Sequence, residues 1–430
     1  MSAASQVLID LTPLRVSAPF RRVFVARLIS LLAIGLLLVS VPVQMFDLTR
    51  SSAHVGAATA VTGLCTFVGM LLGGMLADRF DRKLLIIIGR SGAALSFAGL
   101  AANAFGAFGG EPLVWVVYLL AVVDGLIGAL STSALMAAVP TLIPAEHLMA
   151  VGAINSLTVR IGAAVSPGIA GFIIAGAGVE WAYTVAALGG VLTVLILLGL
   201  PSMPPTAPTG GPAAVSTPTP EDTAAQPEPP SLLDFLRTQR VVTGVMIVGV
   251  VTMLGTGLIA LLPSLVAERF DENAAATGLL YAAVAAGAMV AALTSGWMSG
   301  VTRPGRLLLI VLILAGGFQI LFGLAPFAWL AIAVLFVIGF LDAVGEVIRY
   351  ALIQEHTPGP LLGRVNGIWM AQEVGGVTVG ALVAGLLGTI WAASDAIVYY
   401  GVILAILGVI AALTLRALVG VRREPALATR

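Results

Sequence analysis

Long apolar stretches separated by short polar segments make up most of this chain. Most are close to the roughly 20 residues that a helix needs to cross the hydrocarbon core of a bilayer. They lack the strict alternation of barrel strands, and they predict helices because the backbone in lipid must satisfy its own hydrogen bonds. We expect twelve spans, six before and six after a central polar segment. They cover residues 22–46, 54–77, 84–108, 113–138, 147–178 and 180–200, then 241–266, 275–299, 307–325, 327–355, 361–388 and 395–417.

The polar segment between the two sets runs from Pro201 to Pro230 and holds ten prolines with Thr, Ala and acidic residues. Such a composition buries no core and resists helix formation. It predicts a flexible linker. Ser231 to Arg240 is amphipathic and is expected to lie along the membrane surface. The predicted organisation is an N-terminal bundle over 1–200, the linker with its amphipathic segment over 201–240, and a C-terminal bundle over 241–430.

The two sets of spans carry landmarks at a shared offset. Gly56 and Gly74 are spaced like Gly278 and Gly296, and Asp124 and Pro140 are spaced like Asp342 and Pro358. A common offset indicates an internal duplication, which is frequent among transporters. The fold predicted is therefore all-α, with two pseudo-symmetric bundles of six transmembrane helices.

Composition agrees with a membrane protein. Hydrophobic residues make up 59% of the chain, and the mean hydropathy is +1.07. Charged residues make up 10%, whereas soluble domains carry about 25%. The net charge of zero argues against a nucleic-acid partner. A single cysteine, Cys65, excludes an intramolecular disulfide and a cysteine metal cluster. The first apolar run lacks a cleavage pattern, so we do not expect a removable signal peptide.

The loop arginines and lysines predict orientation. If the N-terminus is cytoplasmic, nearly all of them fall on the cytoplasmic side, and only Arg50 and Arg269 fall outside. Because basic loops stay in the cytoplasm, both termini and the linker are expected there.

The loop after the second span reads GGMLADRFDRK from Gly73 to Lys83. It resembles the G-x-x-x-D-R-x-x-R-K signature of the major facilitator superfamily, with Asp81 in place of the usual glycine. In that family the acid faces the N-terminal end of the eleventh helix, so the resemblance implies a latch between the two halves. The alternative is an ordinary basic loop. The residues of this latch motif are Gly74, Asp78, Arg79, Arg82 and Lys83.

A second motif lies in the fifth span. RIGAAVSPGIAG, from Arg160 to Gly171, resembles the antiporter motif G-x-x-x-G-P-x-x-G-G, with Ser166 for one glycine and Ala170 for another. In the superfamily this motif accompanies export. Small residues around a proline also allow close, bendable helix packing, which is the alternative. The residues of this antiporter-type motif are Gly162, Ser166, Pro167 and Gly171.

Nearly the whole chain outside the linker resembles the enterobactin exporter branch of this superfamily. The stretches that carry the resemblance are FRRVFVARLIS, VPVQMFDLT, YLLAVVDGLIGAL, INSLTVRIGAAVSPGIAG and LLGRVNGIWMAQ. The resemblance implies a monomeric, proton-driven exporter of a catecholate siderophore in the bacterial inner membrane. The related macrolide and multidrug efflux proteins give the nearest alternative, and a lipid-handling or sensor protein is a more distant one.

Charged side chains inside the spans are costly, so each is expected to be paired, near an interface or facing a wet cavity. Asp124, Arg160, Asp342 and Glu373 fall near the bilayer midplane, where transporters hold cargo. Glu346 lies one turn beyond Asp342 on the same helix face. In the family the first, fourth, seventh and tenth helices line the cavity, which implies opposite walls for Asp124 and Asp342. We predict that these five residues supply the proton-coupling and cargo-orienting groups.

The alternative is that some of these charges form structural ion pairs, Asp124 with Arg160 and Glu346 with Arg349. Arg27 and Arg90 lie near the cytoplasmic edge, where snorkelling is expected. Further polar and aromatic residues are candidates for contact with cargo or with a facing helix, and packing is the alternative for the aromatic ones. They are Gln44, Asn155, Tyr281, Tyr350, Asn366, Trp369 and Gln372.

The charges of the C-terminal half bear on the cargo. A catecholate siderophore is neutral to anionic and favours arginine and aromatic walls, yet Asp342, Glu346 and Glu373 cluster there. Ionised, they would fit a cationic drug better. The sequence holds no phosphate-binding loop, metal-ligand cluster or nucleophile triad, so we expect neither an enzyme nor a cofactor. Energy should then come from the proton gradient.

Overall fold

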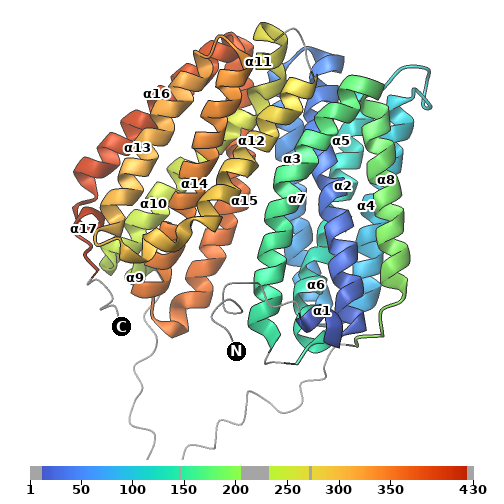
Figure 1. Ribbon diagram of the computed structural model, residues 1–430, viewed down its shortest axis with the longest axis horizontal. Helices are drawn as coiled ribbons and strands as arrows, with labels where there is room; N and C mark the ends of the chain where they lie inside the picture. Colours follow the sequence, from blue (N-terminus) through green and yellow to red (C-terminus); the bar gives the residue numbers. More distant parts are fainter. Residues whose placement is uncertain (1–11, 145–146, 205–231, 271–273, 424–430) are drawn as a thin grey trace, which may run out of the picture.

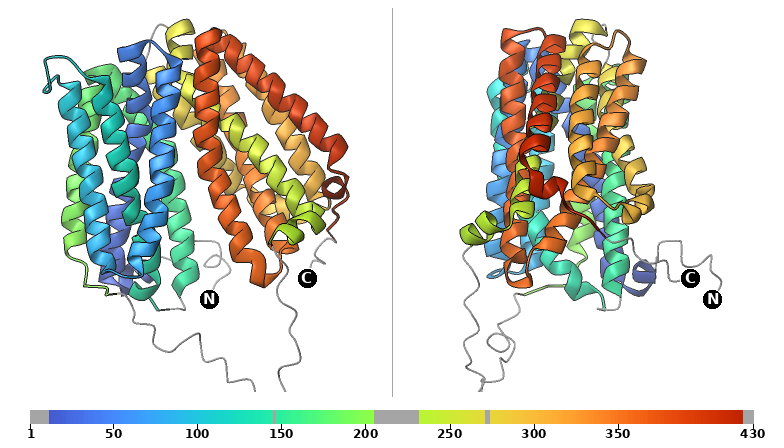
Figure 2. Two further views of the ribbon diagram at one scale, coloured as in Figure 1. Left: turned by 180° about the vertical axis from the view of Figure 1, so that it is seen from behind. Right: turned by 90° about the vertical axis from the view of Figure 1, so that its left-hand side faces the viewer.

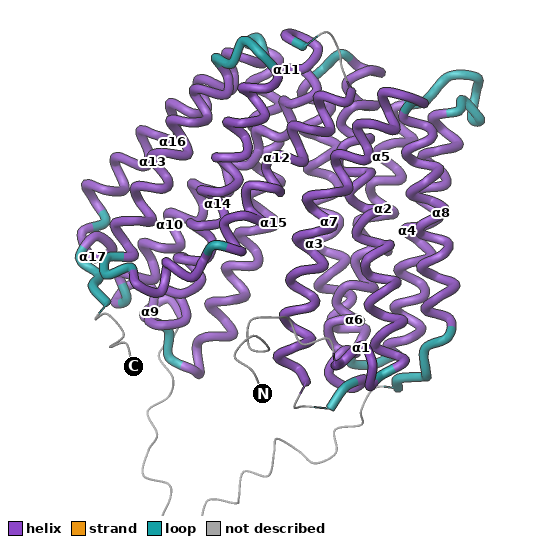
Figure 3. Tube along the Cα trace, in the orientation of Figure 1, coloured by secondary structure: helices purple, strands orange, loops and turns teal. Residues whose placement is uncertain are grey.

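The computed structural model of the chain describes residues 12–144, 147–204, 232–270 and 274–423. Its described residues fold into helices joined by short loops (Figure 3). In the N-terminal half the helices are α1 Thr12–Val16, α2 Ala18–Thr49, α3 Ser52–Ala77, α4 Arg82–Ala104, α5 Val114–Val123, the π-helix η2 Asp124–Gly128, α6 Ala129–Leu142, α7 Leu148–Ala177 and α8 Val179–Leu198. The predicted all-α class is confirmed.

The C-terminal half follows the same plan. Its helices are α9 Leu232–Thr238, α10 Arg240–Gly255, the 3-10 helix η4 Thr256–Leu261, α11 Leu262–Arg269, α12 Ala274–Leu293, the 3-10 helix η5 Ser295–Gly300, α13 Pro304–Gly323, α14 Ala328–His356, α15 Gly359–Ile390, α16 Ala393–Thr414 and α17 Arg416–Val419. Eleven described spans are long and apolar enough to cross a membrane, and α7, with its apolar stretch Ile161–Ala177, supplies the twelfth. The chain is a multi-pass membrane protein.

The helices form two bundles, one from each half of the chain (Figure 1). We call the end of the bundles that carries Ala18, Pro204, Leu232 and Arg416 the basal end, and the opposite end, which carries Ser52 and Arg269, the distal end. The bundles meet at the distal end and diverge toward the basal end in both views along this direction (Figures 1 and 2). The contact between them is made by α3 with α15 and by α7 with α12.

Glycines bring these helices into close contact at the distal end. A Cβ atom at Gly56 would lie 3.1 Å from the Cα of Gly385, and one at Gly278 would lie 2.4 Å from the Cα of Gly171. Ser52 and Ser264 join the halves there by a hydroxyl–hydroxyl hydrogen bond of 2.6 Å. Small residues permit this approach because helices in lipid associate through close packing rather than through a hydrophobic effect.

The seventh span is broken where η4 interrupts it. A 3-10 turn leaves backbone carbonyls without their usual α-helical partners. The hydroxyl of Tyr400 donates to the Leu254 carbonyl at 2.6 Å, and that of Tyr281 donates to the Ile259 carbonyl at 3.1 Å. Gly257 packs directly on the backbone of Gly380 at this break. The break is therefore held by side chains of the C-terminal bundle and by close contact with α15.

The segment predicted to be amphipathic begins as α9. Phe235 of α9 is buried in the core of the C-terminal bundle, and Leu232 and Leu236 pack against that core. The Thr243 hydroxyl donates to the Leu236 carbonyl and ties α9 to α10. These contacts fix the start of the seventh span to a short helix at the basal end.

Candidate functional site

A cavity of about 460 Å3 lies between the two halves. Pockets that bind small molecules have volumes of about 300 to 1,000 Å3. Its walls come from α2, α3, α4, α5, η2 and α7 of the N-terminal half and from α15 of the C-terminal half, and their surface is largely apolar. Asp124 and Glu373 are the acidic residues that line it, one from each half. The arrangement suits an apolar or aromatic cargo with a few polar groups.

Asp124 begins the π-helix η2 in the middle of the fourth span. A π-turn inside an α-helix is frequently found at functional sites. Gly125 presses this turn against α3, since a Cβ there would lie 2.6 Å from the Cβ of Cys65. Gly128 keeps the opposite side open, because a Cβ there would lie 3.1 Å from Oδ1 of Asp124. The backbone around the carboxylate is thus shaped by glycines.

Arg90 of α4 lies near Asp124 and interacts electrostatically with it and with Arg27. Its guanidinium donates to the Ser30 hydroxyl of α2. The expectation that Arg90 snorkels to the membrane edge is therefore wrong, because the side chain turns into its bundle and donates a hydrogen bond to Ser30. The side chain of Arg160, the expected partner of Asp124, lies outside the described residues.

A smaller pocket of about 240 Å3 lies within the N-terminal half, between α2, α6 and α7. Arg27 and Asn155 both line it. The predicted candidate Asn155 thus shares a pocket with a basic side chain that lies within electrostatic reach of Arg90.

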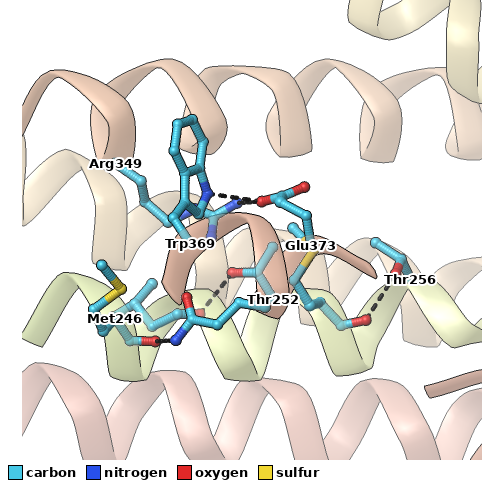
Figure 4. A network of polar contacts seen from close by, with 9 residues as sticks. Met246, Thr252, Thr256, Arg349, Trp369 and Glu373 are labelled. Atoms are coloured by element: carbon cyan, nitrogen blue, oxygen red, sulfur yellow. Dashed lines mark hydrogen bonds and ion pairs between the residues drawn. The ribbon is translucent and has the colours of Figure 1, made fainter. Parts of the chain in front are cut away.

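Glu373 is held by two donors from the C-terminal half (Figure 4). Arg349 Nη2 lies 3.2 Å from Glu373 Oε1, and Trp369 Nε1 donates to the same oxygen at 2.9 Å. Arg349 is only 1% exposed, whereas the Glu373 side chain is 36% exposed. An arginine from α14 therefore offsets the charge of a carboxylate that lines the cavity on α15.

Several polar atoms around this network have no hydrogen-bond partner among the described residues. They are Nε of Arg349, Oε1 of Gln372 and Oδ1 of Asn366. The Gln372 amide nitrogen donates to the Met246 carbonyl at 3.1 Å and ties α15 to α10. Buried polar atoms without partners are uncommon, so this cluster is a place where cargo or water would be favourable.

Asp342 lies on the wall of a different cavity, of about 50 Å3. The lining residues all belong to the C-terminal half and include Thr252, Thr256 and Gln319. The implied placement of Asp124 and Asp342 on opposite walls of one cavity differs from this arrangement, because this face of α14 turns into its own bundle. Arg349 and Glu346 are close enough to interact electrostatically with Asp342. Arg349 therefore connects Asp342 with Glu373.

Other predicted cargo contacts have structural partners. Tyr183 of α8 donates to Oε1 of the buried Gln44 at 2.8 Å, inside the N-terminal bundle. Tyr281 is buried against the η4 break. Tyr350, by contrast, is exposed, and its ring lies 5.1 Å from that of Trp369. The aromatic pair Tyr350–Trp369 therefore remains the candidate for contact with an aromatic cargo.

The latch motif lies at the basal end. Gly74 has no atom within 4 Å of the position that a Cβ would take, and Asp78 and Arg79 are exposed. Asp81 caps α4 by accepting from the Lys83 amide at 2.8 Å. The Arg82 amide donates to the Met203 carbonyl at 3.0 Å. In the described residues, the motif is therefore bonded to the chain after α8. The surface of α3 at Gly74 has no neighbour packed against it.

The antiporter-type motif packs α7 against two neighbours. The Ser166 hydroxyl donates to the Gly162 carbonyl at 2.6 Å and fits against Gly35 of α2. On the other side, Pro167 and Gly171 meet Gly278 of α12. The small residues of the motif thus bring α7 against the first span and across the interface to the eighth.

Sequence reasoning missed two features of the site. Thr59, Thr62 and Thr66 place a row of hydroxyls along the cavity face of α3. Their helical spacing was a signal that the sequence offered. The role of Arg90 depends on its side chain reaching Ser30 of α2 and the neighbourhood of Asp124, and no local pattern carried that information.

Comparisons with known proteins agree with this architecture. The sequence profile of the Major Facilitator Superfamily matches residues 23–358 and 245–429. An enterobactin exporter EntS from Escherichia coli is 38% identical over 421 residues, which cover 97% of each chain. The same exporter from another Escherichia coli strain is 39% identical over 423 residues, again covering 97% of each chain.

Solved structures share the fold at low identity. The crystal structure of the nucleoside transporter NupG matches with a TM-score of 0.69 at 14% identity and covers 94% of this chain and 100% of that one. A peptide transporter POT in complex with sulfate matches with a TM-score of 0.70 at 13% identity, covering 95% and 96%. These likenesses concern the arrangement of the helices.

Proposed function

This chain belongs to the Major Facilitator Superfamily, and on that premise we propose that it exports a catecholate siderophore of the enterobactin class across the bacterial cytoplasmic membrane. The observation that carries the cargo assignment is the similarity to enterobactin exporters over 97% of both chains. Transport is by alternating access of the cavity that contains Asp124 and Glu373.

The charges of the cavity support this cargo class. Arg349 offsets Glu373, and Arg90 adds positive charge beside Asp124. Arg349 therefore offsets the charge of the one acid of the C-terminal half that lines the cavity, which weakens the reason to favour a cationic cargo. A catechol ring suits the exposed ring of Tyr350, which lies 5.1 Å from that of the partly buried Trp369.

Glu373 and Arg349 supply a physical basis for proton coupling. Protonation of Glu373 would remove the charge that holds Arg349, and a buried arginine without a counterion is costly. Arg349 would then shift its interaction toward Asp342, with which it already interacts electrostatically. Uptake of a proton by Glu373 at the cavity wall would thus change the contact between α14 and α15.

The conformation is the one that would accept cargo from the cytoplasm. The halves are in contact at the distal end, and Gly74 of the basal end is unpacked. With the basal end in the cytoplasm, as the basic loops favour, both termini are cytoplasmic. The proposal includes a monomeric transporter rather than an enzyme, one that uses the proton gradient and needs no cofactor.

Proteoliposomes test the proposal. Purified protein is reconstituted, and an acidic interior is imposed in the presence of radiolabelled enterobactin outside. We expect accumulation that a protonophore abolishes and that liposomes without protein lack. Equal accumulation with and without the pH gradient would refute proton coupling, and no accumulation of enterobactin under any gradient would refute the cargo assignment.

A second candidate is broad efflux of amphipathic drugs or macrolides. The largely apolar lining of the cavity favours it, because Leu, Ile and Val discriminate weakly between apolar molecules. The same liposomes offered a macrolide or a cationic dye distinguish the two. Accumulation of the drug without accumulation of enterobactin would establish this second function instead.

A further inference from the structure

Four arginines surround one pocket of about 370 Å3 at the basal end of the C-terminal half. The pocket lies where α13 begins and where α16 passes into α17, on the side of the bundle away from the N-terminal half (Figure 1). We call it the four-arginine pocket. Its lining residues are Arg303, Arg306, Arg416 and Arg422 with Ala412, Leu413, Val419 and Gly420.

The backbone around the four-arginine pocket is held together by specific contacts. Leu418 of α17 is fully buried, and its carbonyl lies so close to Gly305 that a Cβ there would be 1.9 Å away. The Arg423 amide donates to the Thr302 carbonyl at 2.9 Å. Arg423 also pairs with Glu355 of α14, at 2.6 Å for Nη2 and 3.0 Å for Nε. The start of α13 and the chain after α16 are therefore docked together.

The four arginines are not neutralised by the described part of the chain. None of their side chains makes an ion pair or hydrogen bond there, and the neighbouring acid Glu355 is already bound by Arg423. Like charges gathered around one pocket repel one another. A bound anion would convert that repulsion into attraction.

The first turn of α13 adds to the positive potential. Pro304, which has no amide hydrogen, opens this helix of 20 residues, and the Leu307 amide donates to the Arg303 carbonyl at 3.2 Å. The amides of Gly305 and Arg306 are the first-turn donors without a partner within the helix. The amides and the helix dipole favour negative charge at this end. The four-arginine pocket thus combines four guanidinium groups with the positive end of a helix.

Apolar side chains continue the pocket toward the bilayer. Leu413, at the end of α16 and three residues before Arg416, is 69% exposed, and Ile310, one turn beyond Arg306 on α13, is 52% exposed. Both lie on the bilayer side of the arginines because both helices run from the basal end into the membrane. The charged group of an anion with apolar chains would contact the arginines, and its chains would contact the apolar side chains on the bilayer side.

We propose that the four-arginine pocket binds the head group of an anionic phospholipid, such as phosphatidylglycerol or cardiolipin. The phosphate lies among the four guanidinium groups, and the acyl chains run along Leu413 and Ile310. Basic pockets between spans are a recurring way to recognise such lipids. Free phosphate shares the phosphate chemistry but not the acyl chains. The proposal is independent of the cargo, since no residue of the pocket lines the central cavity.

Native mass spectrometry of the purified, detergent-solubilised full chain tests the proposal. The protein is titrated with phosphatidylglycerol, with phosphatidylcholine as the neutral lipid and with inorganic phosphate as the free anion. The pocket variant is Arg306→Gln/Arg416→Gln. The matched control is Arg15→Gln/Arg364→Gln, which removes the same charge from exposed arginines at the basal end outside the pocket.

We expect the wild type to retain phosphatidylglycerol in preference to phosphatidylcholine. The pocket variant should bind phosphatidylglycerol roughly 25-fold more weakly, because each basic residue near the head groups contributes a factor of roughly five. The control variant should change little. An equal loss in both variants, or no loss in the pocket variant, would overturn the proposal. Competition by millimolar inorganic phosphate that displaces the lipid completely would reassign the pocket to a free anion.

Discussion

Asp124 and Glu373 come from opposite halves of the chain and line the same cavity of about 460 Å3. Asp124 lies at a π-turn beside Arg90, and Glu373 is bound by Arg349 and Trp369. Each acid therefore has a basic neighbour from its own bundle. A change of charge on either one alters both the cavity and the packing of the bundle behind it.

Asp124→Asn should abolish the part of transport that depends on the pH gradient. An amide keeps the size and the hydrogen-bonding capacity of the side chain but cannot exchange a proton at neutral pH. We expect accumulation in acidic-interior proteoliposomes to fall to the level seen without a gradient, while cargo binding persists. Asp395→Asn, at an exposed acid near the distal end of α16, is the matched control. Gradient-driven transport in Asp124→Asn equal to the wild type would exclude Asp124 as a coupling group.

Glu373→Gln should destabilise the protein because it leaves the buried Arg349 without its counterion. Removing one partner of a buried pair costs about 3 to 5 kcal/mol, and partial exposure of Glu373 reduces the expected cost to about 1 to 3 kcal/mol. Adding Arg349→Met should restore much of the loss, since the unpaired charge is then gone. Thermal unfolding in detergent measures the free energies of this double-mutant cycle.

The exposed pair Arg423–Glu355 is the control for that cycle. Its side chains are 25% and 44% exposed. Surface pairs contribute about 0 to 1 kcal/mol, so Glu355→Gln should shift the melting temperature much less than Glu373→Gln. Equal shifts for the two variants would show that the Glu373–Arg349 pair is not structurally special.

Cross-linking of cysteine pairs at the distal and basal ends of the contact between the two bundles should change in opposite directions. In a Cys65→Ala background, Ser52→Cys with Ser264→Cys places two thiols where the hydroxyls are 2.6 Å apart, and it should cross-link in the present conformation. The contacts of Gly56 with Gly385 and of Gly63 with Thr378 define an antiparallel register. Continued to the basal end, this register sets Gly74 opposite Gly367, and both are unpacked.

Gly74→Cys with Gly367→Cys should therefore cross-link only when the basal end closes. Conditions that raise cross-linking of this pair should lower it for the distal pair, because two rocking bundles cannot close at both ends while a central cavity is kept. Mass spectrometry after mild oxidation measures disulfide formation in the distal pair and in the basal pair. Simultaneous cross-linking of both pairs in one molecule would contradict rocking about the cavity.

Asp81 should attach the residues after α8 to the start of α4 in a pH-dependent way. Burial by itself raises the pKa of Asp81, but hydrogen bonds from Ser202, Met203 and Lys83 outweigh it and hold the pKa below its ordinary value. The attachment is therefore fully present above the unfolded pKa of about 3.9, and it is lost as the pH falls through the lower folded pKa.

Asp81→Ala should speed hydrogen exchange of the Met203 and Lys83 amides at neutral pH. Loss of a helix N-cap costs about 1 kcal/mol, which corresponds to roughly fivefold faster exchange. Asp81→Asn should retain most of the protection, since asparagine caps helices equally well. Unchanged exchange at both amides in Asp81→Ala would show that other contacts hold this segment.

The sequence alone determined the class of the molecule and the order of its spans. Long apolar runs indicate that the chain lies in a lipid bilayer, because a helix in lipid must be apolar over a fixed length whatever it packs against. The second span, expected over 54–77, is α3 Ser52–Ala77, and the tenth, expected over 327–355, is α14 Ala328–His356. The family followed from the loop motif at Asp78 and from longer stretches, since these are contiguous in the chain.

Only the tertiary structure decided the irregular turns and the pairing of charges. The π-turn at Asp124 and the 3-10 break at Thr256 depend on neighbours such as Cys65 and Tyr400, which are remote in sequence. Arg349 pairs with Glu373 on the next helix, and Asp342 turns into its own bundle. Helical spacing fixes which residues share a face, but the rotation of each helix and the identity of its neighbours arise from packing between helices.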